Sequence, residues 1–264
     1  MFVGRSQAIL QLRERVAKVA PPHASIFITG ESGVGKEVAA NEVHRLSARK
    51  GEFVARNCAS LGEGLIESEL FGHKRGAFTS AFERRKGIFE QADSGTIFLD
   101  EITEMKPELQ AKLLRALESN QIVRVGGQTA IPVKVRVVAA TNRSPQEAVA
   151  CGDFRRDLYY RVKVIHLAIP PLRDRLEDLE DLVPYLIREI NAEEGKEVEG
   201  VDAESLAMLF RYSWPGNVRE TPKCDPSSGH HARARIDSSR GSSGRDLSAP
   251  ALIKSGGFRQ AHWQ

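Results

Sequence analysis

Five short apolar runs divide the first two thirds of the chain. They read SIFIT (25–29), FVARN (53–57), TIFLD (96–100), KVRVVAATN (134–142) and VKVIHLAI (162–169). Each has the length of a buried strand, and segments with helical patterns separate them. Strands that alternate with helices are typical of βαβ units. The pattern therefore predicts an α/β fold, with a parallel five-stranded sheet and helices on both faces.

Two of the intervening segments carry clear helical signals. One runs from Lys36 to Ala48. In the other, Pro107 stands where a first turn would start and Asn120 where the helix would end. Three leucines fall on one helical face between them, namely Leu109, Leu113 and Leu117. These are the crossover helices that an α/β fold requires.

The pattern changes twice towards the C-terminus. After Pro171, apolar residues recur at helical spacing between 179 and 190, and a second helix is expected over 203–212. We therefore expect an α/β subdomain over 1–169 and a small helical subdomain over 170–220. From 221 to 264 the chain is rich in Ser, Gly, Pro and Arg without an apolar period, which predicts disorder.

Composition narrows the class of protein. The 264 residues are 41% hydrophobic and 28% charged, as in ordinary soluble proteins. No apolar run approaches the roughly 20 residues that span a bilayer, and no signal peptide is evident. The three cysteines show no CxxC spacing, so a disulfide scaffold or a zinc site is not expected. These features predict a cytoplasmic protein with no membrane partner.

Charge is unevenly distributed along the chain. Of the 38 Lys and Arg and the 35 Asp and Glu, residues 221–264 hold 7 and 3, which leaves 31 and 32 for residues 1–220. A nucleic-acid-binding domain usually carries a clear positive excess. By composition, residues 1–220 are therefore not such a domain.

The segment GESGVGK fits the phosphate-loop pattern G-x-x-x-x-G-K between a strand and a helix. Its members are Gly30, Glu31, Ser32, Gly33, Val34, Gly35 and Lys36. Glycines let backbone N–H groups surround phosphates, and the helix N-terminus adds a positive dipole. The next residue is Glu37, where a Ser or Thr usually binds Mg²⁺. The pattern predicts a nucleotide site in which Lys36 reaches the β- and γ-phosphates.

A second motif, GTIFLDEI (95–102), ends an apolar strand with two acids. Asp100 can hold Mg²⁺, directly or through water, and Glu101 can orient and deprotonate an attacking water. An acidic pair at the end of a strand is often only a solvated turn. Together with the phosphate loop, however, it predicts hydrolysis of ATP.

Six segments then occur in a characteristic order: GESGVGKE, ESELFGHKRGAFTSA, GTIFLDEI, FRRDLYYRV, IPPLRDR and WPGNVRE. In this order they closely resemble the AAA+ central domain of bacterial sigma-54-dependent transcriptional activators, the NtrC-like enhancer-binding proteins. The resemblance covers residues 1–220. It implies a P-loop AAA+ domain with a helical lid.

The resemblance implies further roles at the nucleotide site. Asn57 matches a switch residue that holds the catalytic Glu inactive until the partner is contacted. Thr141 and Asn142 match the sensor I position. Arg155 and Arg161 match arginine fingers that reach the ATP of the next subunit, and on residue pattern alone a surface salt-bridge patch would be favoured there.

The resemblance also implies roles at the two ends of the matched region. Arg219 matches the sensor II arginine of the lid, and residues 2–5 match a start motif that lines the adenine pocket. Because the fingers act between subunits, a ring oligomer is expected, with six subunits in this family.

The loop GAFTSA is implied to contact the sigma-54 factor. Its members are Gly76, Ala77, Phe78, Thr79, Ser80 and Ala81. Phe78 and Thr79 stand at the tip, between small residues that let the loop move. The family pattern is GAFTGA, and Ser80 replaces its second glycine. Because Ser adopts φ > 0 less readily than Gly, we expect weaker coupling of hydrolysis to sigma-54 contact, restored by Ser80→Gly.

The implied function is an ATPase that remodels the sigma-54 RNA polymerase holoenzyme and acts on promoter DNA only indirectly. The family continues with another lid helix, which Pro222 and Pro226 disfavour here. We therefore expect an incomplete lid, interpret the tail as the product of a frameshift or truncation, and detect no DNA-binding domain. The alternative function is a truncated nucleotide-binding regulator that modulates a full-length relative without turnover.

Overall fold

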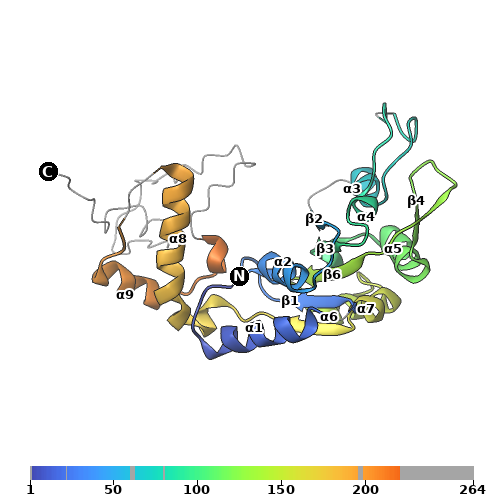
Figure 1. Cartoon of the computed structure of the whole chain (residues 1–264). Coiled ribbons are helices and arrows are strands. Elements are labelled where there is room, and N and C mark those ends of the chain that lie inside the picture. Colours follow the sequence, from blue (N-terminus) through green and yellow to red (C-terminus); the bar gives the residue numbers. More distant parts are fainter. Residues whose placement is uncertain (1, 22, 60–62, 80, 196–198, 221–264) are drawn as a thin grey trace, which may run out of the picture. The chain divides into compact units, whose positions relative to one another are not determined.

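The computed structural model describes residues 2–21, 23–59, 63–79, 81–195 and 199–220 (Figure 1). The chain divides into two compact units, which are described separately. Unit 1 comprises residues 1–2 and 7–171, and unit 2 comprises residues 3–6 and 172–264. The expected tail over 221–264 and the replaced glycine position, Ser80, lie outside the described residues.

Unit 1 is built on the parallel five-stranded sheet that the sequence predicts. Its strands are β1 (Ile26–Thr29), β2 (Phe53–Asn57), β3 (Thr96–Asp100), β6 (Arg136–Thr141) and β7 (Ile165–Ala168). Their order is β2-β3-β6-β1-β7, and every pairing is parallel. All five strands therefore deliver their carboxyl ends to one edge, where α/β proteins bind ligands.

Helices cover both faces of this sheet, because alternate strand residues point to opposite sides. On one face, Ile26 and Ile28 pack in a core with α1 (Gln7–Val19) and α2 (Lys36–Leu46). On the other face, Phe27 and Ile97 belong to a second core. That core is completed by α3 (Glu63–Phe71), α4 (Ile88–Gln91), α5 (Pro107–Ser119), α6 (Pro145–Cys151) and α7 (Arg156–Val162).

A hairpin outside the main sheet connects α5 to β6. It pairs β4 (Gln121–Val123) with β5 (Ala130–Pro132) in antiparallel register. Its base is anchored by Ile122, which is buried in the second core. The hairpin therefore extends from a fixed base beside α5 (Figure 1).

One strand begins later than expected. The apolar run 162–169 predicts a strand over its whole length, but Val162 closes α7 and β7 begins only at Ile165. Val162 and Leu158 are both fully buried on α7, so Val162, the first residue of the run, packs as part of the helix. An apolar run alone does not separate the end of a helix from the start of a strand.

Unit 2 is helical. It contains η2 (Leu172–Asp174), η3 (Leu176–Asp178), α8 (Leu179–Glu194), α9 (Ala203–Arg211) and η4 (Asn217–Glu220). At its centre Trp214 is fully buried, and its indole N–H donates to the Leu209 carbonyl at 3.0 Å. The N-terminal segment belongs to this unit because Ser6 donates from its backbone N–H and its hydroxyl to Asp178, at 2.7 and 2.9 Å.

Candidate nucleotide-binding and partner-contact sites

The phosphate loop lies between β1 and α2, at the carboxyl edge of the sheet. Gly33 and Gly35 have φ of 81° and 102°, which side chains rarely adopt. Between them Val34 is buried in the core shared with α1 and α2, which fixes the loop to the body. Ser32 and Glu37 are exposed, and Glu37 lies in the first turn of α2. The loop therefore has the backbone that the motif predicts.

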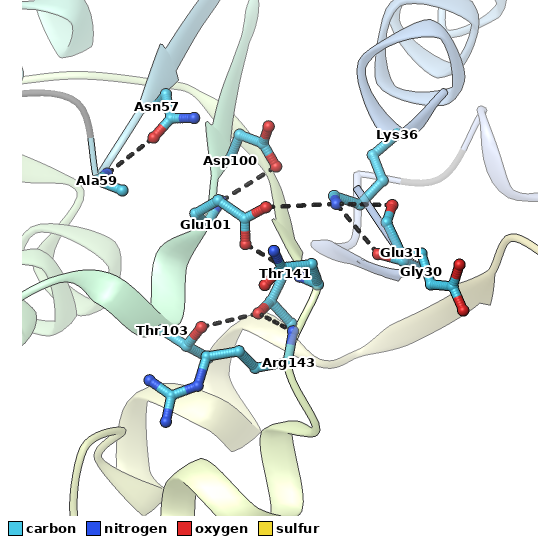
Figure 2. Close-up of polar contacts among 11 residues, drawn as sticks. Gly30, Glu31, Lys36, Asn57, Ala59, Asp100, Glu101, Thr103, Thr141 and Arg143 are labelled. Atoms are coloured by element: carbon cyan, nitrogen blue, oxygen red, sulfur yellow. Dashed lines mark hydrogen bonds and ion pairs between the residues drawn. The ribbon is translucent and has the colours of Figure 1, made fainter. Parts of the chain in front are cut away.

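Lys36 is the first residue of α2, and its side chain is almost fully buried. Its ammonium donates to the carbonyl oxygens of Gly30 and Glu31, at 3.1 and 3.3 Å. It also pairs with the Glu101 carboxylate at 3.4 Å. The structure thus brings together the Lys of the first motif and the Glu of the second (Figure 2).

Glu101 follows the last residue of β3 in a left-handed conformation, with φ 51° and ψ 47°. Its second carboxylate oxygen accepts a hydrogen bond from the backbone N–H of Asn142 at 3.0 Å. Asp100 accepts from the backbone N–H of Glu101 at 3.1 Å. Non-glycine residues in this conformation are uncommon and need support from their surroundings, which these bonds supply.

The end of β6 is tied to both motifs. The Thr141 carbonyl accepts from the Gly30 N–H at 3.3 Å. The Thr141 hydroxyl bonds to the Thr103 hydroxyl at 2.8 Å and accepts from the Arg143 N–H at 3.1 Å (Figure 2). Thr103 carries no signal in the sequence, because only the register of β6 against β3 brings it to Thr141.

Asn57 ends β2 and lies opposite Asp100 in the sheet register. Its side-chain oxygen accepts from the backbone N–H of Ala59 at 2.8 Å (Figure 2). Glu101 bonds instead to Lys36 and Asn142. The expectation that Asn57 restrains Glu101 remains a prediction.

The two expected finger arginines lie at opposite ends of α7: Arg155 is the N-cap residue, and Arg161 is in the last turn. Arg155 caps the helix and makes a two-bond pair with Asp157, at 3.1 and 2.7 Å, with both side chains about half exposed. The guanidinium of Arg155 lowers the pKa of Asp157, mainly through these hydrogen bonds. Arg161 donates to the Leu117 carbonyl at 2.5 Å. Both contacts hold the arginines on their own chain, and a role toward a neighbouring subunit remains a prediction.

The residues expected at the two ends of the matched region lie in different units. Phe2 is buried in unit 1, and a Cβ added to Gly35 would come within 3.3 Å of its ring. In unit 2, Arg5 forms ion pairs with Glu180 and Asp181, at 2.7 and 2.5 Å. Arg219 lies in η4. The expected roles of these residues toward a nucleotide remain predictions.

The loop expected to contact a partner is closed by backbone hydrogen bonds. The Gly76 N–H donates to the Ala81 carbonyl at 2.8 Å, and the Ala81 N–H donates to the Phe78 carbonyl at 2.9 Å. Ala81 is buried, whereas Thr79 is exposed at the tip. The ring of Phe78 lies edge-on to His73, with centroids 5.0 Å apart. The neighbouring Phe82, which the sequence analysis did not select, is 78% exposed.

Two further observations limit the kinds of site. Among the described residues, no group of three or more His, Cys, Asp or Glu side chains is arranged to hold a metal ion. No helix within the described ranges is long and apolar enough to cross a membrane. Asp100 ends β3 directly before Glu101, and Mg²⁺ is commonly held by one or two carboxylates together with substrate phosphates.

Two family models match most of the chain. The family model described as the sigma-54 interaction domain matches residues 2–168, and the model described as the AAA+ ATPase lid domain matches residues 173–223. The Nif-specific regulatory protein of Enterobacter agglomerans is 49% identical over 224 residues, which cover 84% of this chain and 43% of that protein. The regulatory protein AtoC of Escherichia coli is 48% identical over 220 residues, which cover 83% of this chain and 48% of AtoC.

Among solved structures, NtrX from Brucella abortus in complex with ATP has a TM-score of 0.76 and 37% identity, covering 83% of this chain and 50% of that one. The chain spans about half the length of the curated relatives it matches. It belongs to the family of sigma-54-dependent transcriptional activators, and unit 1 has the AAA+ P-loop NTPase fold. This confirms the resemblance and the fold class expected from the sequence.

Proposed function

We propose that this chain hydrolyses ATP and uses the energy to remodel a closed promoter complex of sigma-54 RNA polymerase. The observation that carries the proposal is the meeting of Lys36, Glu101 and the Asn142 backbone at one edge of the sheet. NtrX from Brucella abortus, solved in complex with ATP, is similar in overall fold to this chain. Family membership supports the sigma-54 holoenzyme as the target.

The side chains then take distinct parts in the reaction. Backbone N–H groups from Gly30 to Gly35 bind the phosphates, and Lys36 balances their charge. When phosphates bind Lys36, they compete with its contact to Glu101, and the carboxylate becomes free to accept a proton from water. Asn142 keeps Glu101 oriented through its backbone N–H.

Asp100 is the residue that would hold Mg²⁺, whose charge offsets that of the phosphates. Arg155 and Arg161 would stabilise charge on the phosphoryl group of a neighbouring copy. In the structure the Arg155 guanidinium forms an ion pair with the Asp157 carboxylate. A neighbour's nucleotide must therefore draw this arginine away from an exposed carboxylate, which is a weak competitor because surface ion pairs contribute little.

The test is steady-state ATP hydrolysis by the full chain. We expect Glu101→Gln to lower the rate by about 10² or more while ATP binding persists, because general-base catalysis contributes that much. Glu104→Gln is the matched control, since this exposed carboxylate lies three residues away and pairs with Arg143. Its rate should stay within about twofold of the wild type.

The outcomes separate the candidate functions. No turnover by the wild type at high protein concentration, with ATP still bound, would contradict the ATPase and favour a nucleotide-binding regulator. For the promoter function, the wild type with ATP should convert sigma-54 holoenzyme to heparin-resistant open complexes, and Glu101→Gln should not. Hydrolysis without open complexes would leave an ATPase with another client.

A further inference from the structure

The segment 72–86, here named the arm, carries both apolar and charged residues that are exposed, among them Phe82, Arg84 and Lys86. Its base is a backbone ladder: the N–H groups of His73 and Arg85 donate to each other's carbonyls, at 3.0 and 3.1 Å. Val125 of the adjoining hairpin bonds to Gly72 and Lys74 on the other side, at 2.9 and 3.1 Å. The arm leaves the body near α3 and α4 (Figure 1).

Two phenylalanines flank the turn at its tip, and they are not equivalent. Phe78 is 36% exposed and contacts His73, whose ring nitrogen bonds to the Ser68 hydroxyl at 2.6 Å. Phe82 is 78% exposed, the largest fraction of any large apolar side chain in the described part of the chain. In this conformation Phe82 therefore offers a partner a larger fraction of its ring than Phe78 does.

The arm is also strongly basic. Four exposed cations, Lys74, Arg75, Arg84 and Lys86, form no ion pair with any described residue. Arg85 is paired with Glu69 at 2.9 Å. The arm contains one carboxylate, that of Glu83.

The exposed Phe82 ring and the exposed cations together indicate the chemistry of a binding partner. An exposed aromatic ring gains by entering an apolar pocket, and unpaired cations of one sign gain by meeting carboxylates around its rim. Nucleic acid would satisfy the cations as well. However, residues 1–220 hold 31 basic and 32 acidic side chains, so they lack the overall positive excess that is usual in a nucleic-acid-binding domain. The combination favours an acidic polypeptide segment with an apolar centre.

We propose that Phe82, which directly follows the expected contact loop GAFTSA (76–81), is a second apolar anchor for the partner. We also propose that the arm's cations select an acidic segment of the partner protein. This deepens the proposed function and rests on it, since it names the chemistry by which the same loop would recognise sigma-54. Phe78 engages once the partner has displaced its ring from His73. The cations act earlier, by steering the encounter.

The experiment measures binding of purified sigma-54 factor to the full chain with a non-hydrolysable ATP analogue. Phe82→Ala should weaken binding about tenfold at any salt concentration, as expected for a central aromatic anchor. Leu10→Ala on α1 is its control, because Leu10 is an apolar side chain exposed by 40%. The double variant Arg84→Glu, Lys86→Glu should weaken binding at least tenfold at low salt, with a much smaller effect at about 0.5 M.

The charge control is Lys50→Glu with Arg115→Glu, which changes net charge equally at exposed sites outside the arm. Both controls should bind like the wild type. If the wild type binds sigma-54 and the arm variants bind equally well, the inference fails and the proposed function stands. If the arm variants lose only the binding of a promoter DNA fragment, the partner is nucleic acid and the inference is overturned. If the wild type binds no sigma-54, the proposed function fails as well.

Discussion

Lys36 is buried and has its charge balanced by Glu101, so the two residues form one electrostatic unit. A buried charge without a partner is costly, which explains why the Glu101 carboxylate lies against this lysine. The motif spacing identifies both residues because it reflects local backbone chemistry. It does not identify the hydrogen bond from the Asn142 N–H to the Glu101 carboxylate, because that bond depends on how β6 registers against its neighbours.

The pKa of the Cys58 thiol is affected by burial and by the nearby carboxylates of Asp100 and Glu101. Burial raises the pKa of its thiol to about 12, and the charges of Asp100 and Glu101 add to the effect. The raised pKa keeps the thiol protonated, with a thiolate fraction at pH 8 of roughly 10⁻⁴. Sequence alone indicates only a free cysteine, since burial and neighbouring charges are tertiary properties.

The prediction concerns alkylation by iodoacetamide at pH 8, followed by mass spectrometry of peptides. Cys151 is exposed and should be modified readily in the native protein. Cys58 should react only after denaturant is added, because the reactive thiolate is almost absent in the folded state. Equal rates for the two cysteines in the native protein would contradict the buried environment of Cys58.

At the scale of elements, the sequence predicts the strands better than what surrounds them. All five strands appear because buried parallel strands are continuous apolar runs. The helix α1 is not among the elements predicted above, although Ile9, Leu12 and Val16 carry a helical period and are buried. The hairpin of β4 and β5 is not predicted either, because its strands have three residues each and are too short to show an apolar pattern. Gly126 could have indicated its turn.

Gly126, in the hairpin between β4 and β5, lies against Ala77 of the segment GAFTSA. It has φ 71°, and an added Cβ would lie 2.9 Å from the Cβ of Ala77. Gly152 has a similar φ of 82° but no atom within 4 Å of an added Cβ. The two glycines therefore share a conformational preference and differ in their contact with a neighbour.

This pair gives a controlled prediction. Gly152→Ala should lower the free energy of unfolding by about 1 kcal/mol, because alanine is strained at positive φ, and Gly126→Ala should lower it further, because its added Cβ also meets Ala77. Only Gly126→Ala should also weaken sigma-54 binding severalfold, since it displaces Ala77. Thermal unfolding and the binding assay measure the two effects separately. Equal binding by both variants would show that the hairpin does not position the loop.

At the scale of the whole molecule, the candidate catalytic groups on one copy fall into two sets. The first set, around Lys36 and Glu101, is assembled by the sheet of unit 1. The second, Arg155 and Arg161, is bonded to Asp157 and to the Leu117 carbonyl of the same chain. Sequence and family predict both sets. Under the proposed mechanism they meet only when a second copy is present, whose arrangement one chain does not contain.

Mixing two inactive variants tests whether that second copy completes the site. Arg155→Ala keeps its own Glu101 but lacks a finger, and Glu101→Gln keeps its finger but lacks the base. If the finger acts between subunits, a mixed assembly contains some sites with an intact Glu101 facing an intact Arg155. We expect each variant alone to hydrolyse ATP at least about 10²-fold more slowly than the wild type, since a finger contributes roughly 10³–10⁵ where measured. The mixture should recover a measurable fraction of the wild-type rate, rising with total protein concentration. A mixture no faster than the mean of its components would place Arg155 in its own subunit's site, because every site would then retain one defect.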